Sequence, residues 1–384
     1  MAPQLDALQI NAPEHPVLTT HSQDEVETNL RVGWTSWLLA EMQRRLMSGC
    51  FVLDIQQSVY HEQRTSKSTQ TPQCLPWLPC PEDIWEATSA TIWASRLSEH
   101  RALQATLVDD PFLANISSNN LRKMPPFSQS ILLCSQFSKL PTRHDFKYPN
   151  DYIPHSIHPD LATLIHEFNF NPKTEAFLLF YHTPLQDLLA IAGDTWVFSR
   201  KITPASAFHA SQSRLKTWSM SLTGAAATQH ACRVLKAELL RHFPRSVVQD
   251  PREQESGLEG CISDYWVFYI ATLVCWAFGH RYQAHSYGGS LAGSNRSTEL
   301  DSSTDVPATS GYAERKAMDY LTAMLDFSVE DLLTSKASVK ADSSSVIQVV
   351  KERLEKREGG SSGMLLDAIN CLNKIIQGGT GKWF

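Results

Sequence analysis

The chain has 384 residues, of which 42% are hydrophobic and 19% are charged, enough for two or three domains of about 150 residues or for one large helical unit. Its 17 glycines and 20 prolines are about a tenth of the chain, far below the 25–30% that is typical of low-complexity sequences. The net charge is −6 and no basic stripe is visible, so the sequence argues against autonomous binding of DNA or RNA.

The eight cysteines show no CxxC spacing. Three of them (Cys232, Cys275 and Cys371) lie in apolar runs, where a reduced cysteine behaves as a small hydrophobic residue. The first residues contain neither a basic start nor an apolar block, so no secretory signal is visible. We therefore expect reduced thiols and an intracellular protein.

Residues 1–29 are rich in proline and polar residues and are predicted to be poorly ordered. A helix is predicted from Trp34 to Tyr60, because residues recur on it at three- and four-residue steps. One stripe of this helix consists of Leu39, Met42, Leu46, Cys50 and Leu53. A second stripe consists of Trp34, Trp37, Leu38, Glu41 and Arg45. A helix with two buried stripes is mostly enclosed, so we expect both to be buried.

The rest of the chain also has helical patterns. Pro184 lies inside an apolar segment, 174–192, and should break its helix at Thr183, with Gly193 as a stop. The apolar run Tyr265–Phe278 has 14 residues, too short for a membrane span of about 20, and predicts a buried core helix. We predict an all-α fold: a helical regulatory domain over 30–284, a Ser/Gly/Thr-rich linker over 285–310, and a helical part over 311–384 that packs on the same core.

Several residue groups resemble chemical sites without meeting their requirements. The Gly378–Lys382 segment lacks the first glycine, the Ser or Thr and the following helix of a phosphate loop. His155, His158 and Asp160 could bind a metal, but their spacing does not determine a coordination geometry. His182 and Asp187 could serve as a base and its partner, or could satisfy each other in a broken helix. We predict no catalytic, cofactor-binding or metal residue, no cofactor, and no enzyme.

Two sequence blocks go beyond composition. The first block contains Trp34, Trp37, Glu41, Arg44, Arg45 and Asp54. The second block contains Leu78, Pro79, Cys80, Trp85 and Glu86, and is followed by Trp93. Together they resemble the regulatory (middle homology, xylanolytic-activator-like) domain of fungal zinc-finger transcription factors, in the subgroup with two-Cys two-His fingers. With downstream blocks that include His182–Trp196 and Cys261–Arg281, the resemblance covers roughly residues 30–384.

This resemblance implies an all-α transcription regulator in the nucleus. Its partners would be transcription factors or coregulators, with a small-molecule effector and dimer formation left open, and no membrane association is expected. Family members place a zinc-dependent DNA reader before this domain, whereas this chain shows no such Cys/His spacing. We therefore expect contact with DNA only through a partner.

The two blocks have two interpretations. Glu41 and Arg45 are four residues apart on the tryptophan stripe, so they could form a partly buried ion pair within a scaffold. Aromatic walls with one ion pair could also line an effector pocket. For the whole chain the alternatives are an inactive truncated paralogue or fragment of a longer factor, and a metal-dependent hydrolase or lyase. The helix Met364–Ile376 could be core or interface.

Overall fold

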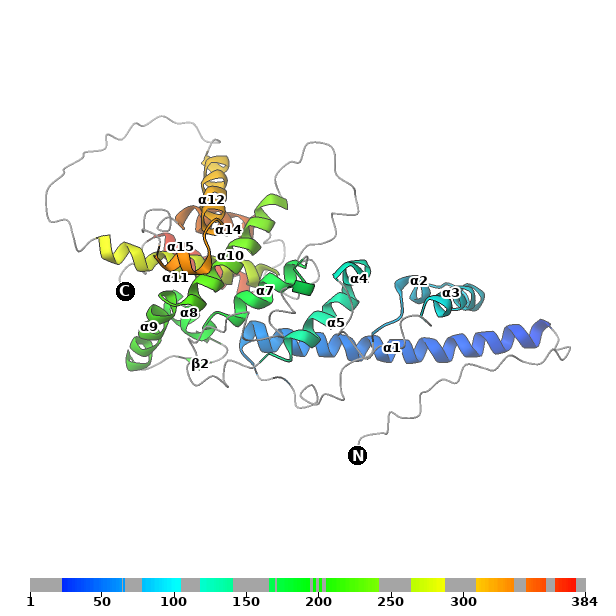
Figure 1. Ribbon diagram of the computed structural model, residues 1–384. Coiled ribbons are helices and arrows are strands. Elements are labelled where there is room, and N and C mark those ends of the chain that lie inside the picture. The colour runs from blue at the N-terminus through cyan, green and yellow to red at the C-terminus, as the bar shows by residue number, and fades with distance from the viewer. Residues whose placement is uncertain are drawn as a thin grey trace. The chain divides into compact units, whose positions relative to one another are not determined.

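The computed structural model describes the chain in segments, and every structural statement below concerns them: 23–63, 65, 78–104, 118–140, 166–169, 171–193, 196–197, 200–201, 205–241, 264–286, 309–334, 343–356 and 363–377. These segments contain fourteen helices and one pair of two-residue strands (Figure 1). The strands, β1 (Trp196–Val197) and β2 (Arg200–Lys201), pair antiparallel. The predicted all-α fold is confirmed.

Contacts divide the described residues into two compact units. The first unit takes the described residues up to Cys50, those in Pro76–Ile116, and Pro125–Ser128. The second takes the remainder, from Phe51 onward. The last helices of the chain belong to this second unit together with the helices before the predicted linker.

The first unit contains most of α1 (Gln23–His61), with α2 (Glu82–Trp85) and α3 (Ala90–Gln104). Residues 23–29, predicted to be poorly ordered, form the start of α1; its first turn carries Asp24 and Glu25, which favour the positive end of the helix dipole. Ser89 caps α3, because its hydroxyl accepts a hydrogen bond from the Ile92 amide at 3.2 Å. A small apolar core joins these helices, and it consists of Ile84, Ala87 and Trp93 with the partly buried Leu30, Trp34, Trp37, Cys80, Ala94 and Leu97.

The two predicted stripes of α1 differ in burial. The tryptophan stripe packs inward, and the rings of Trp37 and Trp93 are 5.5 Å apart. The other stripe is exposed: Leu39, Leu46 and Leu53 are 59%, 68% and 43% accessible, and Met42 and Cys50 are also exposed. The prediction that both stripes are buried is therefore wrong for the first, because helical periodicity shows that a stripe is apolar but not whether another element covers it.

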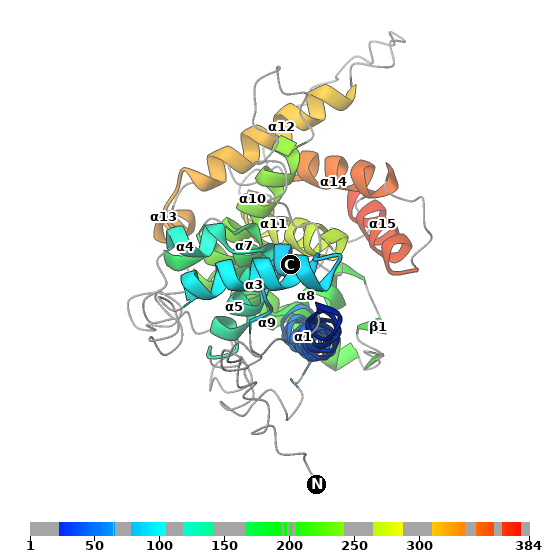
Figure 2. The ribbon, with the colours of Figure 1, turned by 90° about the vertical axis from the view of Figure 1, so that its right-hand side faces the viewer.

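The second unit is built from short and long helices around α10 (Leu222–Arg241) and α11 (Asp264–Ser286). The others are α4 (Ser118–Lys123), most of α5 (Pro126–Phe137), α7 (Pro172–Tyr181), α8 (Leu185–Ala192), α9 (Ala205–Ser219), α12 (Thr309–Leu325), α13 (Val329–Thr334), α14 (Ser344–Lys356) and α15 (Gly363–Ile376). Helix α10 contacts α7, α9, α11, α12 and α13. In Figures 1 and 2, α12 and α14 lie side by side.

Helix α11 confirms the predicted core helix. Its side chains from Trp266 to Phe278 are buried on every face, and the indole N–H of Trp266 donates to the Tyr60 carbonyl at 3.0 Å. Among the described helices, none has both the length and the apolar character needed to cross a bilayer. The ends of the predicted linker, 285–286 and 309–310, belong to α11 and α12, and 287–308 lies outside the described residues.

The break at Pro184 is also confirmed. Helix α7 ends at Tyr181 and α8 begins at Leu185, because proline has no amide hydrogen and its ring clashes with the preceding turn. Gly193 ends α8 in the left-handed conformation, with φ of 100°. Helix α15, whose role the sequence left open, buries Leu365, Ile369 and Leu372 in the core, and the Cys371 thiol donates to the Ala192 carbonyl at 3.0 Å.

The turn between α9 and α10 generates a stability prediction. A Cβ at Gly224, the third residue of α10, would overlap the Trp218 carbonyl oxygen, which itself accepts the Ser221 amide at 2.9 Å. We expect Gly224→Ala to lower the free energy of unfolding by about 1–3 kcal/mol through overpacking, as measured by urea denaturation.

Gly311 is the matched control, because it is the third residue of α12 and has no atom within 4 Å of an added Cβ. Gly311→Ala should be neutral or stabilise the protein by up to about 1 kcal/mol. Equal effects of the two substitutions would contradict the close approach at Gly224.

Candidate functional site

The first candidate site is a charged cluster in the first unit. Glu41 on α1 is completely buried, and its carboxylate accepts hydrogen bonds from the Cys80 backbone amide at 2.8 Å and from Arg45 Nε at 3.2 Å. It also forms an ion pair with Arg44. Removing a carboxylate from water is unfavourable unless its oxygens are paired and hydrogen-bonded, and these partners meet that requirement.

Arg45 connects α1 to the segment that leads into α2. Its Nη1 lies 3.2 Å and 3.3 Å from the two carboxylate oxygens of Glu82, and its Nη2 donates to the Cys80 carbonyl at 3.1 Å. Its guanidinium lies over the Trp85 ring, 4.5 Å from the ring centroid, a favourable cation–π distance. Burial alone lowers the pKa of Arg45, but the hydrogen bonds to Glu82 and Cys80 outweigh burial, so the pKa is raised from its ordinary value.

The Cys80 thiol is held in its neutral form. Burial, together with the negative charge of Glu41, raises the pKa of Cys80 to about 12. Because the thiolate is the reactive species, this cysteine is a poor nucleophile at neutral pH. The cluster therefore offers no activated group for catalysis.

The structure brings most of the predicted block residues together. Trp34, Trp37, Trp85 and Trp93 surround the cluster or its apolar core, and Pro79 is buried beside Cys80. Leu78 is half-buried, Glu86 is exposed at the end of α2, and Asp54 is half-buried in the part of α1 that belongs to the second unit. The glutamate and arginine contact each other directly, a geometry that matches the scaffold interpretation of these blocks.

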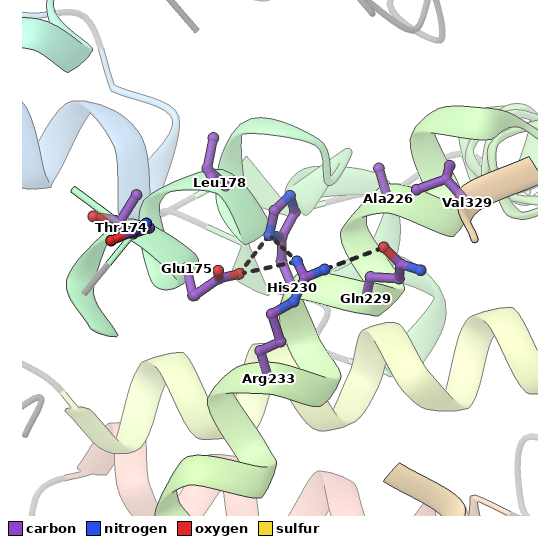
Figure 3. Close-up of a pocket in the computed structure, with 9 residues that line it drawn as sticks. Thr174, Glu175, Leu178, Ala226, Gln229, His230, Arg233 and Val329 are labelled. Atoms are coloured by element: carbon purple, nitrogen blue, oxygen red, sulfur yellow. Dashed lines mark hydrogen bonds and ion pairs between the residues drawn. The ribbon is translucent and has the colours of Figure 1, made fainter. Parts of the chain in front are cut away.

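The second candidate site is a pocket in the second unit, with a volume of about 160 Å³. It is lined by Asn169, Thr174, Glu175, Leu178, Ala226, Gln229, His230, Arg233 and Val329. Figure 3 shows side chains from α7, α10 and α13 around it. Polar groups occupy one wall, and Leu178, Ala226 and Val329 supply apolar surface.

A hydrogen-bonded group of charges forms the polar wall of the pocket (Figure 3). The ring Nδ1 of His230 lies 2.6 Å from Glu175 Oε2, whereas Arg233 contacts Glu175 and Gln229 at the longer distance of 3.4 Å. Burial raises the pKa of Glu175, but the His230 hydrogen bond and the Arg233 charge outweigh it, so this pKa is lowered. The sequence did not single out this group, because Glu175 and His230 are 55 residues apart and only packing unites them.

The other groups tested from sequence have structural partners or lie outside the described residues. Asp187 forms a bidentate pair with Arg214 at 2.6 and 2.9 Å, and the carbonyl of the buried His182 accepts the Trp218 indole N–H at 2.8 Å. His155, His158 and Asp160 lie outside the described residues. Within the described segments, no group of three or more His, Cys, Asp or Glu side chains could hold a metal ion.

Residues 12–193 match the family model of the fungal specific transcription factor domain. The chain contains a fungal specific transcription factor domain. No curated protein and no solved structure was found to match the chain. The match includes the charged cluster and Glu175, whereas His230 and Arg233 lie beyond it. The domain supports the role of a transcription regulator and a function in the nucleus, and it is a regulatory domain rather than an enzyme family.

The buried carboxylate of this domain gives a second stability prediction. Glu41→Gln removes the charge that Arg44 and Arg45 face, so we expect the free energy of unfolding to fall by about 3 kcal/mol. The control is Glu27→Gln, which breaks the exposed Glu27–Arg31 pair on the same helix and should cost at most about 0.5 kcal/mol. If urea denaturation showed the same small decrease in the free energy of unfolding for both variants, the buried cluster would contribute no more stability than the exposed ion pair.

Glu175 should make stability depend on acid pH. Its pKa in the folded state lies below its ordinary value of 4.5, so its ionised form stabilises the fold above that value and the contribution is lost as the pH falls through the folded-state pKa. Thermal melts from neutral to acid pH should show Glu175→Gln less stable than the wild type at neutral pH, with the difference shrinking below about pH 4.5. Asp367→Asn, at an exposed residue of α15, should follow the wild-type curve, and a constant difference for Glu175→Gln would contradict this role.

Proposed function

We propose that this transcription regulator acts in the nucleus through contacts with other transcription factors or coregulators, and that it reaches DNA only through them. The observation that carries the proposal is the domain match over residues 12–193. The net charge of −6 also favours protein contacts over direct DNA binding, because a chain that binds nucleic acid usually has a basic patch or stripe.

We further propose that the pocket beside Glu175 binds a small effector with an anionic group and an apolar body. Arg233 is 42% exposed, and its contacts with Glu175 and Gln229 are both 3.4 Å long. A ligand carboxylate could form shorter, charge-assisted bonds with this guanidinium. Leu178, Ala226 and Val329 would contact the apolar part, in the manner of small-ligand sites with few polar groups.

The charged cluster of the first unit offers no activated nucleophile. The cluster around Glu41 is closed by its own ion pairs, and Cys80 is held as a neutral thiol. We propose that the chain functions without a cofactor and without enzymatic activity.

The test of function is to tether the full chain to an unrelated DNA-binding domain and to measure a reporter gene across growth conditions. The chain should raise or lower reporter output, and a fluorescent fusion should accumulate in the nucleus. An unchanged reporter under every condition would contradict the proposal and favour an inactive paralogue or fragment.

The effector part is tested in the same assay with Arg233→Gln. This substitution should reduce the change in reporter output between growth conditions, because it removes the proposed anchor of the anionic group. Lys236→Gln removes a positive charge from the same helix away from the pocket lining and should leave the response intact. Equal responses from both variants would contradict an effector at this pocket.

A further inference from the structure

The contacts in the polar wall of the pocket determine which nitrogen of His230 carries a proton. Its Nδ1 lies 2.6 Å from Glu175 Oε2 and 3.3 Å from Arg233 Nη1 (Figure 3). A carboxylate only accepts and a guanidinium only donates, so one ring nitrogen cannot satisfy both. The shorter contact assigns the proton to Nδ1, which donates to Glu175. Arg233 therefore gains no acceptor from His230, and Nε2 carries no proton when His230 is neutral.

The charges of this wall cancel before a ligand arrives. Glu175 carries one negative charge and Arg233 carries one positive charge. Apart from His230, the other described residues that line the pocket are uncharged. A histidine changes its charge between about pH 5 and pH 8. An anion that enters the pocket therefore meets a wall with no net charge unless His230 gains a proton.

A second histidine lies behind this wall. The ring of His182 stacks on that of His230, with 5.7 Å between the ring centroids and 6° between the planes. His182 is buried and does not line the pocket, so protonating it would place a charge deeper inside the protein, which is unfavourable. His230 already donates to the Glu175 carboxylate, and a nearby negative charge favours the protonated form of a histidine. The proton that accompanies an anion therefore goes to His230.

The size of the pocket limits the apolar part of a ligand. The pocket volume is about 160 Å³, and an apolar cavity of about 150 Å³ is large enough to bind benzene. Leu178, Ala226 and Val329 supply the apolar surface. Arg233 is the most exposed of the charged lining residues, so an anionic group can reach it from solvent while a ring fills the pocket.

We propose that the pocket binds a monocarboxylate whose apolar body has the size of one six-membered ring, and that its binding takes up one proton on His230. This inference rests on the effector site proposed above and adds its ligand class and its pH dependence. The carboxylate pairs with Arg233, and its charge favours the protonated form of His230. Affinity therefore increases as the pH falls, by at most about tenfold per pH unit for one proton.

The test is isothermal titration calorimetry of the purified full chain with benzoate, in two buffers of equal pH and different ionisation enthalpy. The wild type should take up close to one proton per benzoate at about pH 7.5, and its affinity should rise between about pH 8 and pH 6.5. The pKa of Glu175 is lowered, so both carboxylates stay ionised over this range. Benzamide, a neutral molecule of the same shape, should show no such pH dependence.

Two substitutions identify the groups that act. His230→Gln keeps a side chain that can donate to Glu175 but cannot gain a proton, so benzoate binding should lose both the proton uptake and the pH dependence. Its matched control is His209→Gln, at an exposed histidine of α9 outside the pocket lining, which should keep both. Arg233→Gln should weaken benzoate binding at least about tenfold, because it removes a charge-assisted contact. Circular dichroism checks that each variant is folded.

Four results would overturn the proposal. They are a wild type that does not bind benzoate, benzoate binding without proton uptake, equal loss of proton uptake in His209→Gln and His230→Gln, and binding of 2-naphthoate as tight as that of benzoate, because its second ring exceeds the pocket. Each of these results would leave the reporter activity of the tethered chain unaffected. A silent reporter together with proton-linked benzoate binding would instead contradict the regulatory function and support the site.

Discussion

The arrangement of the first unit depends on the burial of one carboxylate. Glu41 is inaccessible to water, and an isolated charge in that position would be strongly destabilising. Its oxygens are satisfied by Arg44, Arg45 and the Cys80 amide, so the segment before α2 must lie against α1 in one register. Arg45 extends the same constraint through Glu82 and the Trp85 ring. Apolar contacts alone would allow this segment to shift along α1, whereas this set of directional hydrogen bonds and ion pairs specifies one position.

In this arrangement α2 and α3 pack against one face of α1 and do not cover the opposite face. The tryptophans and Glu41 lie on the inward stripe, and Leu39, Met42 and Leu46 remain exposed on the outside. The inward side of this helix thus combines apolar tryptophans with an ion-paired cluster, and its outward side between Val32 and Cys50 also carries apolar side chains.

The second unit follows a different principle. Helices α10 and α11 provide a mostly apolar centre, and the buried polar groups there are individually satisfied, as in the bond from the Trp218 indole to the His182 carbonyl. The pocket lies where α7, α10 and α13 meet, and among its charged side chains His230 is the most buried and Arg233 the most exposed. The strong contact joins His230 to Glu175, while Arg233 is held loosely.

The sequence by itself determined the helical class, the break at Pro184, the stop at Gly193, the core helix Tyr265–Phe278 and the pairing of Glu41 with Arg45, because these depend on local periodicity, backbone chemistry or residues one turn apart. Only the tertiary structure decided which stripe of α1 is buried, since both have helical periodicity and the choice depends on what α2 and α3 cover. It also decided that Glu175 meets His230 and Arg233, and that Asp187 pairs with Arg214. These contacts join helices that are far apart in the chain. They depend on tertiary packing, which local sequence patterns do not predict.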